Sequence, residues 1–195
     1  MRYLRDGELA TARGVSAEYD IPYIPMPNTA DVVLSDLLAP DTATPTAFVF
    51  PFFDNGDLLL ARNRRRDLEV PGGHRDMMRT GVLEHPSEAA RREAREETGA
   101  ELAELVPVGF MRSVSRASKP VGYRYPFPVS CQQFFAARIA DVAGYTENDE
   151  CLAPMRVTPD EALDMFNRRT VTLYVRAREI LFPRQEPSAG GSLPG

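Results

Sequence analysis

Residues 70–100 constrain the fold and the chemistry of this chain more than any other stretch. They contain a Gly pair, a polar segment and then a charged segment that starts near Pro86, a residue suited to the first position of a helix. Glu93, Glu96 and Glu97 lie at helical offsets of zero, three and four, so their side chains share one helix face. Like charges that close repel one another unless a cation lies among them. The stretch therefore predicts a metal-binding helix.

The rest of the chain alternates strand-like and helix-like segments. Ala47–Phe53 and Leu58–Arg62 flank an Asn-Gly turn and predict a hairpin. Further strands are expected at 106–114, 127–139 and 154–158, and further helices are expected to start at Thr158 and to run over 172–181. Residues 30–38 fit either a strand or a short helix. Mixed strands and helices, with the charged helix after a hairpin, predict an α/β sandwich with helices packed on a central mixed sheet.

Length and composition define the expected domain and setting. The chain has 195 residues, with a compact domain expected over 46–183, an N-terminal extension over 1–45 and a flexible, Pro- and Gly-containing tail over 184–195. The extension could pack on its own domain or on a partner subunit, which would make a homodimer. No stretch has the length of a membrane span, and the N-terminus lacks the apolar core of a signal peptide.

Charge and cysteine content narrow the expected partners. A net charge of −5 argues against non-specific binding to nucleic acid or to acidic membranes, but not against a phosphorylated small molecule. Cys131 and Cys151 are not spaced as a metal-binding pair, which favours two reduced thiols and a cytoplasmic location.

The charged helix has a chemical interpretation and a purely structural alternative. Carboxylates are hard oxygen ligands that suit Mg²⁺ or Mn²⁺, and a Gly-Gly turn lets the backbone approach the same ions. Metals held in this way serve phosphate chemistry, which predicts a hydrolase of a phosphate ester or anhydride. The alternative is a solvated helix face stabilised by pairs such as Arg92 with Glu96.

A family resemblance favours the chemical interpretation. Nudix hydrolases carry a box written G-x5-E-x7-R-E-U-x-E-E-x-G-U, where U is a bulky apolar residue. Glu84, seven residues, and then Arg92 to Ala100 resemble this box, and Pro71-Gly72-Gly73 resembles its opening. Two departures are evident: both U positions are Ala, and ten residues instead of five separate Gly73 from Glu84, an insertion within 74–83.

The resemblance implies roles for individual residues. Glu93, Glu96, Glu97 and the Gly72 carbonyl would be metal ligands. Arg92 would orient the glutamates by salt bridges, and Glu84 would pair with it or support the ligands from outside.

A further Glu from a loop outside the box would act as metal ligand or as base for the attacking water. Glu150 fits best, with Glu147 and Asp149 as rivals. A polar surface loop is the alternative for all three residues.

Substrate contacts are less specific in sequence. Arg62 and Arg64 precede the box and could bind phosphate, although a solvated basic loop is an equal alternative. Tyr123 and Tyr125 could stack on a base, although packing at the rim of the core explains them as well.

The resemblance implies a Nudix-like α/β/α sandwich and the activity of a pyrophosphohydrolase that uses Mg²⁺ or Mn²⁺. Its substrate would be a nucleoside diphosphate linked to another moiety, such as a nucleotide sugar, a nucleoside triphosphate or a damaged nucleotide. One alternative is an inactive Nudix-fold module that binds or senses nucleotides. Another is a structural domain without metal affinity.

Overall fold

The computed structural model describes residues 1–65 and 67–183. A single mixed sheet runs through the molecule in the order β1-β2-β8-β9-β3-β4-β10, with β5, β6 and β7 attached to β4, β3 and β9. The strands are β1 Val15–Tyr19, β2 Asn28–Leu34, β3 Thr46–Phe52, β4 Leu58–Asn63, β5 Asp67–Glu69, β6 Gly72–His74, β7 Ala100–Leu102, β8 Val106–Ser115, β9 Val129–Val142 and β10 Cys151–Val157. The helices are α1 Asp6–Thr11, α2 Pro86–Thr98, α3 Pro159–Met165 and α4 Arg168–Leu181, with a 3-10 turn over Asp41–Ala43.

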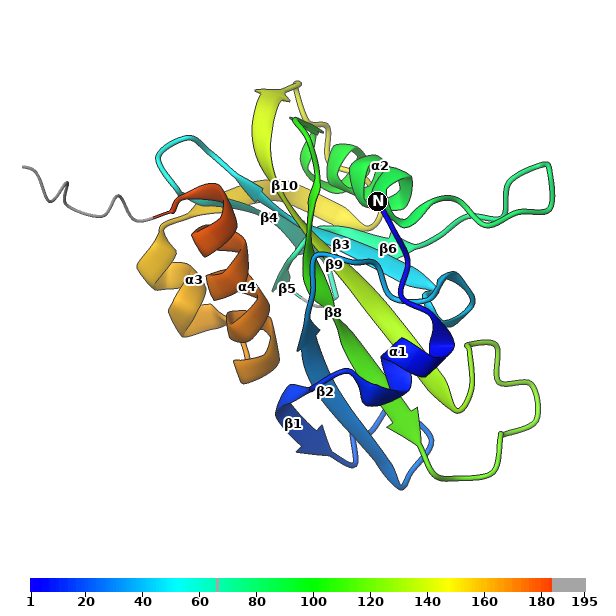
Figure 1. Ribbon diagram of the computed structural model, residues 1–195. Coiled ribbons are helices and arrows are strands. Elements are labelled where there is room, and N and C mark those ends of the chain that lie inside the picture. The colour runs from blue at the N-terminus through cyan, green and yellow to red at the C-terminus, as the bar shows by residue number, and fades with distance from the viewer. Residues whose placement is uncertain (66, 184–195) are drawn as a thin grey trace, which may run out of the picture.

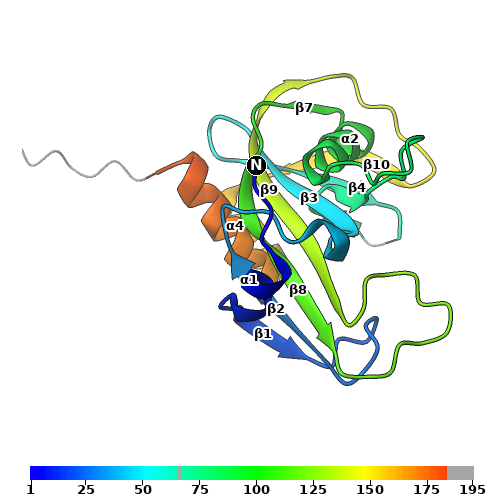
Figure 2. The ribbon, with the colours of Figure 1, turned by 45° about the vertical axis from the view of Figure 1, so that its right-hand side comes forward.

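Helices cover both faces of this sheet, which confirms the predicted α/β sandwich. In Figures 1 and 2, α3 and α4 lie on one side and α2 lies on the other. Leu173, Tyr174 and Ala177 of α4 pack with Phe50 and Phe134 in one buried cluster. A second cluster joins α2 to the opposite face and consists of residues such as Ala89, Ala90, Ala94, Val49 and Phe135.

The helix α2 has the boundaries that its sequence predicts. Pro86 occupies the first turn, and the side chain of His85 accepts a hydrogen bond from the Ser87 N–H. Gly99 ends the helix in the left-handed conformation with φ of 71°. A Cβ at Gly99 would also lie 2.8 Å from the Ala143 carbonyl oxygen, so both backbone and space require glycine here.

Residues 1–45 pack on the sheet of the same chain. The strand β2 pairs antiparallel with β8 from Asn28 opposite Ser115 to Leu34 opposite Gly109. Near the N-terminus, Tyr3 forms a bridge to Leu38. The ambiguous stretch over 30–38 is therefore mainly strand.

Several predicted elements differ from the structure. The strand expected at 154–158 is β10, which covers Cys151–Val157 because it pairs with β4 from Cys151 opposite Asn63. The Gly pair is not a turn but part of β6, because it pairs with β3. The last helix begins at Arg168 instead of Thr172, because the Asn167 side chain caps it by accepting from the N–H groups of Arg169 and Thr170. The strand β9 continues past Ile139 to Val142, since its end pairs with β7. The predicted tail over 184–195 lies outside the described residues.

Two further expectations concern membrane-spanning segments and the cysteines. No helix within 1–65 and 67–183 combines the length and apolar character needed to cross a bilayer. Both cysteines are buried. Burial raises the pKa of Cys131 to about 12, so this thiol stays protonated and inert.

Candidate active site

Two carboxylates of α2 meet the Gly pair of β6. The Gly72 N–H donates a hydrogen bond of 2.9 Å to Oε2 of Glu97. A Cβ at Gly73 would lie 2.5 Å from Oε1 of Glu93, so this carboxylate occupies the space that a side chain there would need. Glycine thus allows the strand and the acidic face of the helix to approach each other closely.

Arg92 binds the acidic residues around it. Its guanidinium contacts Oε2 of Glu84 at 3.0 Å, Oε1 of Glu93 at 3.0 Å and Oε2 of Glu96 at 3.2 Å. It also donates to the His74 carbonyl oxygen at 2.9 Å, which ties α2 to β6. The hydrogen bonds that Arg92 donates to the Glu84 carboxylate are the main cause that raises the pKa of Arg92, so the guanidinium stays charged. The predicted pairing of Glu84 with Arg92 is present.

The inserted residues form a hairpin between β6 and α2. The Glu84 N–H donates to the Asp76 carbonyl oxygen at 2.8 Å, and the Met78 N–H donates to the Val82 carbonyl oxygen at 2.9 Å. In Figure 1 this hairpin projects away from the sheet beside α2. The extra length therefore loops outward, and Glu84 returns to Arg92 despite the insertion.

Arg75 fastens the base of this hairpin. Its side chain is only 1% exposed and contacts the Asp41 carboxylate at 2.6 Å. It also donates to the backbone oxygens of Asp41, Thr44 and Glu84. A buried guanidinium with this many acceptors holds the hairpin to the 3-10 turn before β3.

The carboxylates of α2 offer the hard oxygen ligands that suit a divalent metal. Burial is the main cause that raises the pKa of Glu93, because its charged form loses water without full compensation from Arg92. A hard cation next to Glu93 would supply that compensation. Within residues 1–65 and 67–183, no three acidic, His or Cys side chains already converge on one point, since Glu93 and Glu96 face Arg92 while Glu97 faces Gly72. Ligation therefore requires rotation of these side chains.

The predicted loop glutamate, Glu150, is exposed just before β10. Its N–H donates to Oδ1 of Asn148, and its carbonyl oxygen accepts from the Arg64 N–H. The same loop passes the end of α2, where the Ala143 N–H donates to the Gly99 carbonyl oxygen at 2.9 Å. In the described part of the chain, no hydrogen bond joins the Glu150 side chain to the acidic face of α2. A role for Glu150, or for its rival Asp149, stays a prediction.

The two predicted phosphate-binding arginines lie on β4 and directly after it. Arg64 donates to the Asn148 carbonyl oxygen at 3.0 Å and to Oε2 of Glu147 at 3.3 Å, so it braces the loop before β10. Arg62 is exposed on β4. Neither residue lines the pocket described next. Their contact with phosphate stays a prediction.

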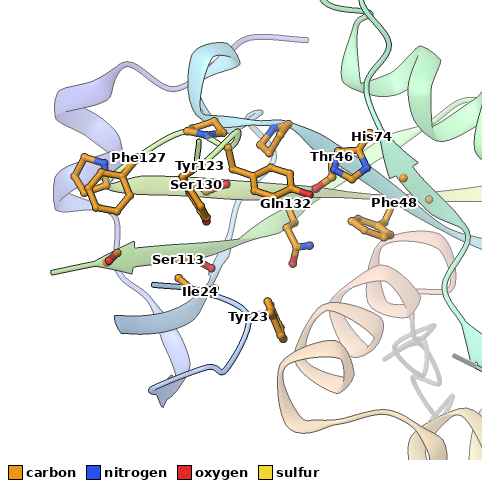
Figure 3. A pocket seen from close by; sticks show the side chains of 17 residues that line it. Tyr23, Ile24, Thr46, Phe48, His74, Ser113, Tyr123, Phe127, Ser130 and Gln132 are labelled. Carbon is orange, nitrogen blue, oxygen red and sulfur yellow. The ribbon is translucent and has the colours of Figure 1, made fainter. Parts of the chain in front are cut away.

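A pocket of about 430 Å³ opens beside the Gly pair (Figure 3). The two predicted tyrosines, Tyr123 and Tyr125, contribute to its wall, and their rings meet edge to face at 5.6 Å. The full lining is Tyr23, Ile24, Pro45, Thr46, Phe48, Gly72, Gly73, His74, Ser113, Ser115, Tyr123, Tyr125, Pro126, Phe127, Pro128, Ser130 and Gln132. These residues include aromatic rings, hydroxyls and an amide, but no Asp, Glu, Lys or Arg.

Sequence reasoning missed the residues that form the floor of this pocket. Thr46 and Phe48 come from β3, and Gln132 comes from β9, which is its parallel neighbour. The alternation of Thr46, Phe48 and Phe50 along β3 indicates one face, but only the strand order shows which residues of β9 lie beside them. His74 lies in β6 and stacks on Tyr125 with ring centroids 5.6 Å apart.

Comparison with known proteins identifies the family. The family model described as NUDIX domain matches residues 42–176, which is more than half of the chain. The chain belongs to the Nudix family. This confirms the class of enzyme that the box predicted, a Nudix-type hydrolase. A search of curated proteins found no match.

Solved structures share the Nudix fold at low sequence identity. A Bacillus subtilis pyrophosphohydrolase has 20% identity and a TM-score of 0.61, covering 87% of this chain and 99% of its own. The NUDIX domain of Shewanella oneidensis NrtR, solved in complex with ADP ribose, has 18% identity and a TM-score of 0.52, covering 70% of this chain and 86% of its own. At such identities the likeness establishes the fold alone.

Proposed function

We propose that this Nudix protein hydrolyses the pyrophosphate bond of a nucleoside diphosphate linked to another moiety. The observation that carries the proposal is the contact between the acidic face of α2 and the Gly pair of β6, at the edge of an uncharged, aromatic-lined pocket. The pocket would take the nucleoside part of a small-molecule nucleotide, and the diphosphate would lie beside the carboxylates. The relative from Bacillus subtilis, named a pyrophosphohydrolase, is consistent with this chemistry.

Mg²⁺ or Mn²⁺ would be held by Glu93, Glu96, Glu97 and the Gly72 carbonyl. When bound, such an ion neutralises phosphate oxygens and lowers the pKa of water. Glu150 would contribute a further carboxylate from the loop before β10, as ligand or as general base.

The residues of the chain itself prepare this site. Arg92 holds Glu93 and Glu96 on one side of α2 and donates to the His74 carbonyl oxygen, so helix and strand keep a fixed separation. Gly73 leaves room for the Glu93 carboxylate. The close packing limits water around Glu93, whose side chain is 15% exposed, and a low dielectric strengthens its attraction to a cation.

A nucleotide-binding module without catalysis is the second candidate. It is favoured by the pocket, which could bind a ligand whether or not the carboxylates hold metal. The NrtR domain, solved with ADP ribose, is similar in fold and illustrates such binding. This candidate predicts nucleotide affinity without turnover.

The test is hydrolysis of dinucleotides, nucleotide sugars and nucleoside triphosphates by the pure full chain with Mg²⁺ or Mn²⁺. The informative variant is Glu97→Gln, because the Gln side-chain oxygen can still accept from the Gly72 N–H while the charge is lost. The matched control is Glu101→Gln in β7, whose exposed carboxylate pairs only with Arg95 in the described structure. We expect turnover by wild type and by Glu101→Gln, and a loss of at least about 100-fold in Glu97→Gln. Turnover by none of them, or equal turnover by all three, would refute the proposal.

A further inference from the structure

The pocket contains a buried hydroxyl that has no hydrogen-bond partner among the described residues. Thr46 is only 7% exposed, and its Oγ1 makes no hydrogen bond to any other described residue. Buried polar groups are rarely left in this state because their lost contacts with water are not replaced. Thr46 lines the pocket, next to His74 in Figure 3, so a bound molecule could supply the missing partner.

Gln132 places an amide beside this hydroxyl. Thr46 and Gln132 are partners in the parallel register of β3 and β9, and they line the same pocket. No hydrogen bond from the Gln132 side chain to another described residue is present. An amide offers two donors and an acceptor, and the hydroxyl offers one donor and an acceptor. Together they can match a ligand edge on which donors and acceptors alternate.

This polar pair continues a sheet face that is otherwise apolar core. Phe48 stacks on Phe134 at 5.0 Å with an interplanar angle of 17°. Phe134 belongs to the cluster beneath α4. The same face extends past the helix as the pocket floor, where Thr46 and Gln132 replace apolar side chains. Polar residues at core-like positions indicate a recognition surface.

The walls and the absence of charge define the chemistry of the occupant. Phe48 and the stacked rings of His74 and Tyr125 offer flat surfaces at one end of the pocket. A charged group would lose its hydration there without gaining a counterion from the lining. A planar, uncharged group with a hydrogen-bonding edge, such as a nucleobase, loses little on entry and gains stacking.

We propose that Thr46 and Gln132 are specificity-determining residues that hydrogen-bond to the edge of an uncharged nucleobase in this pocket. The inference rests on the proposed function for its orientation, because Gly72 and Gly73 line the same pocket and would place the diphosphate at its end. It assigns the selection among bases to the sheet floor and not to the carboxylates of α2.

The test is calorimetric binding of the four common nucleoside 5′-monophosphates to the full chain, with ribose 5-phosphate as the ligand that lacks a base. Monophosphates contain no pyrophosphate bond, so binding is measured apart from hydrolysis. We expect at least one nucleotide to bind about 10-fold or more tightly than ribose 5-phosphate. Thr46→Val, which keeps the side-chain shape, should weaken that binding by about 10-fold.

Thermal stability separates a recognition role from a structural one. Because the Thr46 hydroxyl has no hydrogen-bond partner in the described part of the chain, Thr46→Val should leave the Tm unchanged or raise it. The matched control is Thr172→Val in α4, whose hydroxyl bonds to Ser16 and to the Arg168 carbonyl oxygen outside the pocket. It should lower the Tm and leave nucleotide binding unchanged. Gln132→Leu should weaken the binding of the same nucleotide whose binding Thr46→Val weakens.

The outcomes distinguish this inference from the proposed function. If the protein hydrolyses no pyrophosphate but binds a nucleotide, and Thr46→Val weakens that binding, the inference is supported and only the proposed hydrolase activity is refuted. Hydrolysis by an enzyme whose nucleotide affinity is equal in wild type, Thr46→Val and Gln132→Leu would overturn only the inference. Ribose 5-phosphate binding as tightly as every nucleotide would overturn it too.

Discussion

Replacement of Arg92 by Gln should destabilise the protein far more than the same replacement of Arg95 on the same helix. Arg92 is 24% exposed and pairs with Glu84 and Glu93, whose side chains are 14% and 15% exposed. A hydrogen bond to a charged group is worth about 1.5–3 kcal/mol, reduced here by the partial exposure of the guanidinium. The better-exposed Glu96 adds about 0.3–0.5 kcal/mol as an i,i+4 pair. The expected loss is about 3 kcal/mol.

The matched control is Arg95→Gln, one turn further along α2. Arg95 pairs with Glu101 at 2.6 Å, but the two side chains are 57% and 48% exposed. Such a pair contributes about 0–1 kcal/mol. Urea unfolding of the two variants and of wild type, with equal slopes, would measure the difference in free energy of unfolding.

The effect of Arg92→Gln should also depend on pH. Burial already raises the folded-state pKa of Glu93, and loss of the guanidinium removes the charge that opposes this rise, so the folded state of the variant binds a proton at Glu93 more tightly. The defect is then greatest near neutral pH and becomes smaller as the pH falls through the raised folded-state pKa of Glu93. Equal losses for the two arginine variants, or a defect that grows on acidification, would refute the account of Arg92 as the residue that holds the acidic face.

Three further substitutions test other parts of the site. Gly72→Ala should cost about 1–3 kcal/mol of unfolding free energy, because its Cβ would lie 2.5 Å from the Ala47 carbonyl oxygen and the backbone cannot move aside, whereas Gly144→Ala, with nothing within 4 Å, should unfold like wild type in urea. Glu93→Gln should stabilise the metal-free protein at about pH 7, because burial raises the folded-state pKa of Glu93 and its ionisation therefore opposes folding at high pH. Urea unfolding at a series of pH values should show that this gain in unfolding free energy vanishes below the unfolded-state pKa of about 4. Arg75→Met removes a guanidinium that is 1% exposed and leaves the oxygens around it without a donor. Hydrogen exchange of the backbone amides in 76–84 should then accelerate at least about 10-fold. Unchanged protection of these amides would contradict the anchoring role of Arg75.

The sequence predicted the helix α2 and its partners well because that information is local. Spacing within one helix places Glu93, Glu96 and Glu97 on one face, and Pro86 and Gly99 mark the ends. The pairing of Glu84 with Arg92 also followed from the box, despite the insertion between Gly73 and Glu84.

Other features depended on partners distant in the sequence and were not predicted. The Gly pair belongs to a strand only because β3 lies beside it. The pocket floor needs Thr46 and Gln132 to be neighbours, although 86 positions separate them (132 − 46). Arg75 gave no sign in the sequence that it is buried, since its acceptors come from the distant turn at Asp41–Ala43 as well as from its own hairpin. Sequence order alone does not contain the register of strands that meet through long connections.

The central claim is that the acidic face of α2 binds a divalent cation beside the Gly pair. Calorimetry of the metal-free full chain with Mn²⁺ tests it most directly, using wild type, Glu97→Gln and the control Glu101→Gln. The account predicts that wild type and Glu101→Gln bind Mn²⁺ alike, and that Glu97→Gln binds it about 10-fold or more weakly. Absence of Mn²⁺ binding by wild type, or equal affinity in all three proteins, would contradict it.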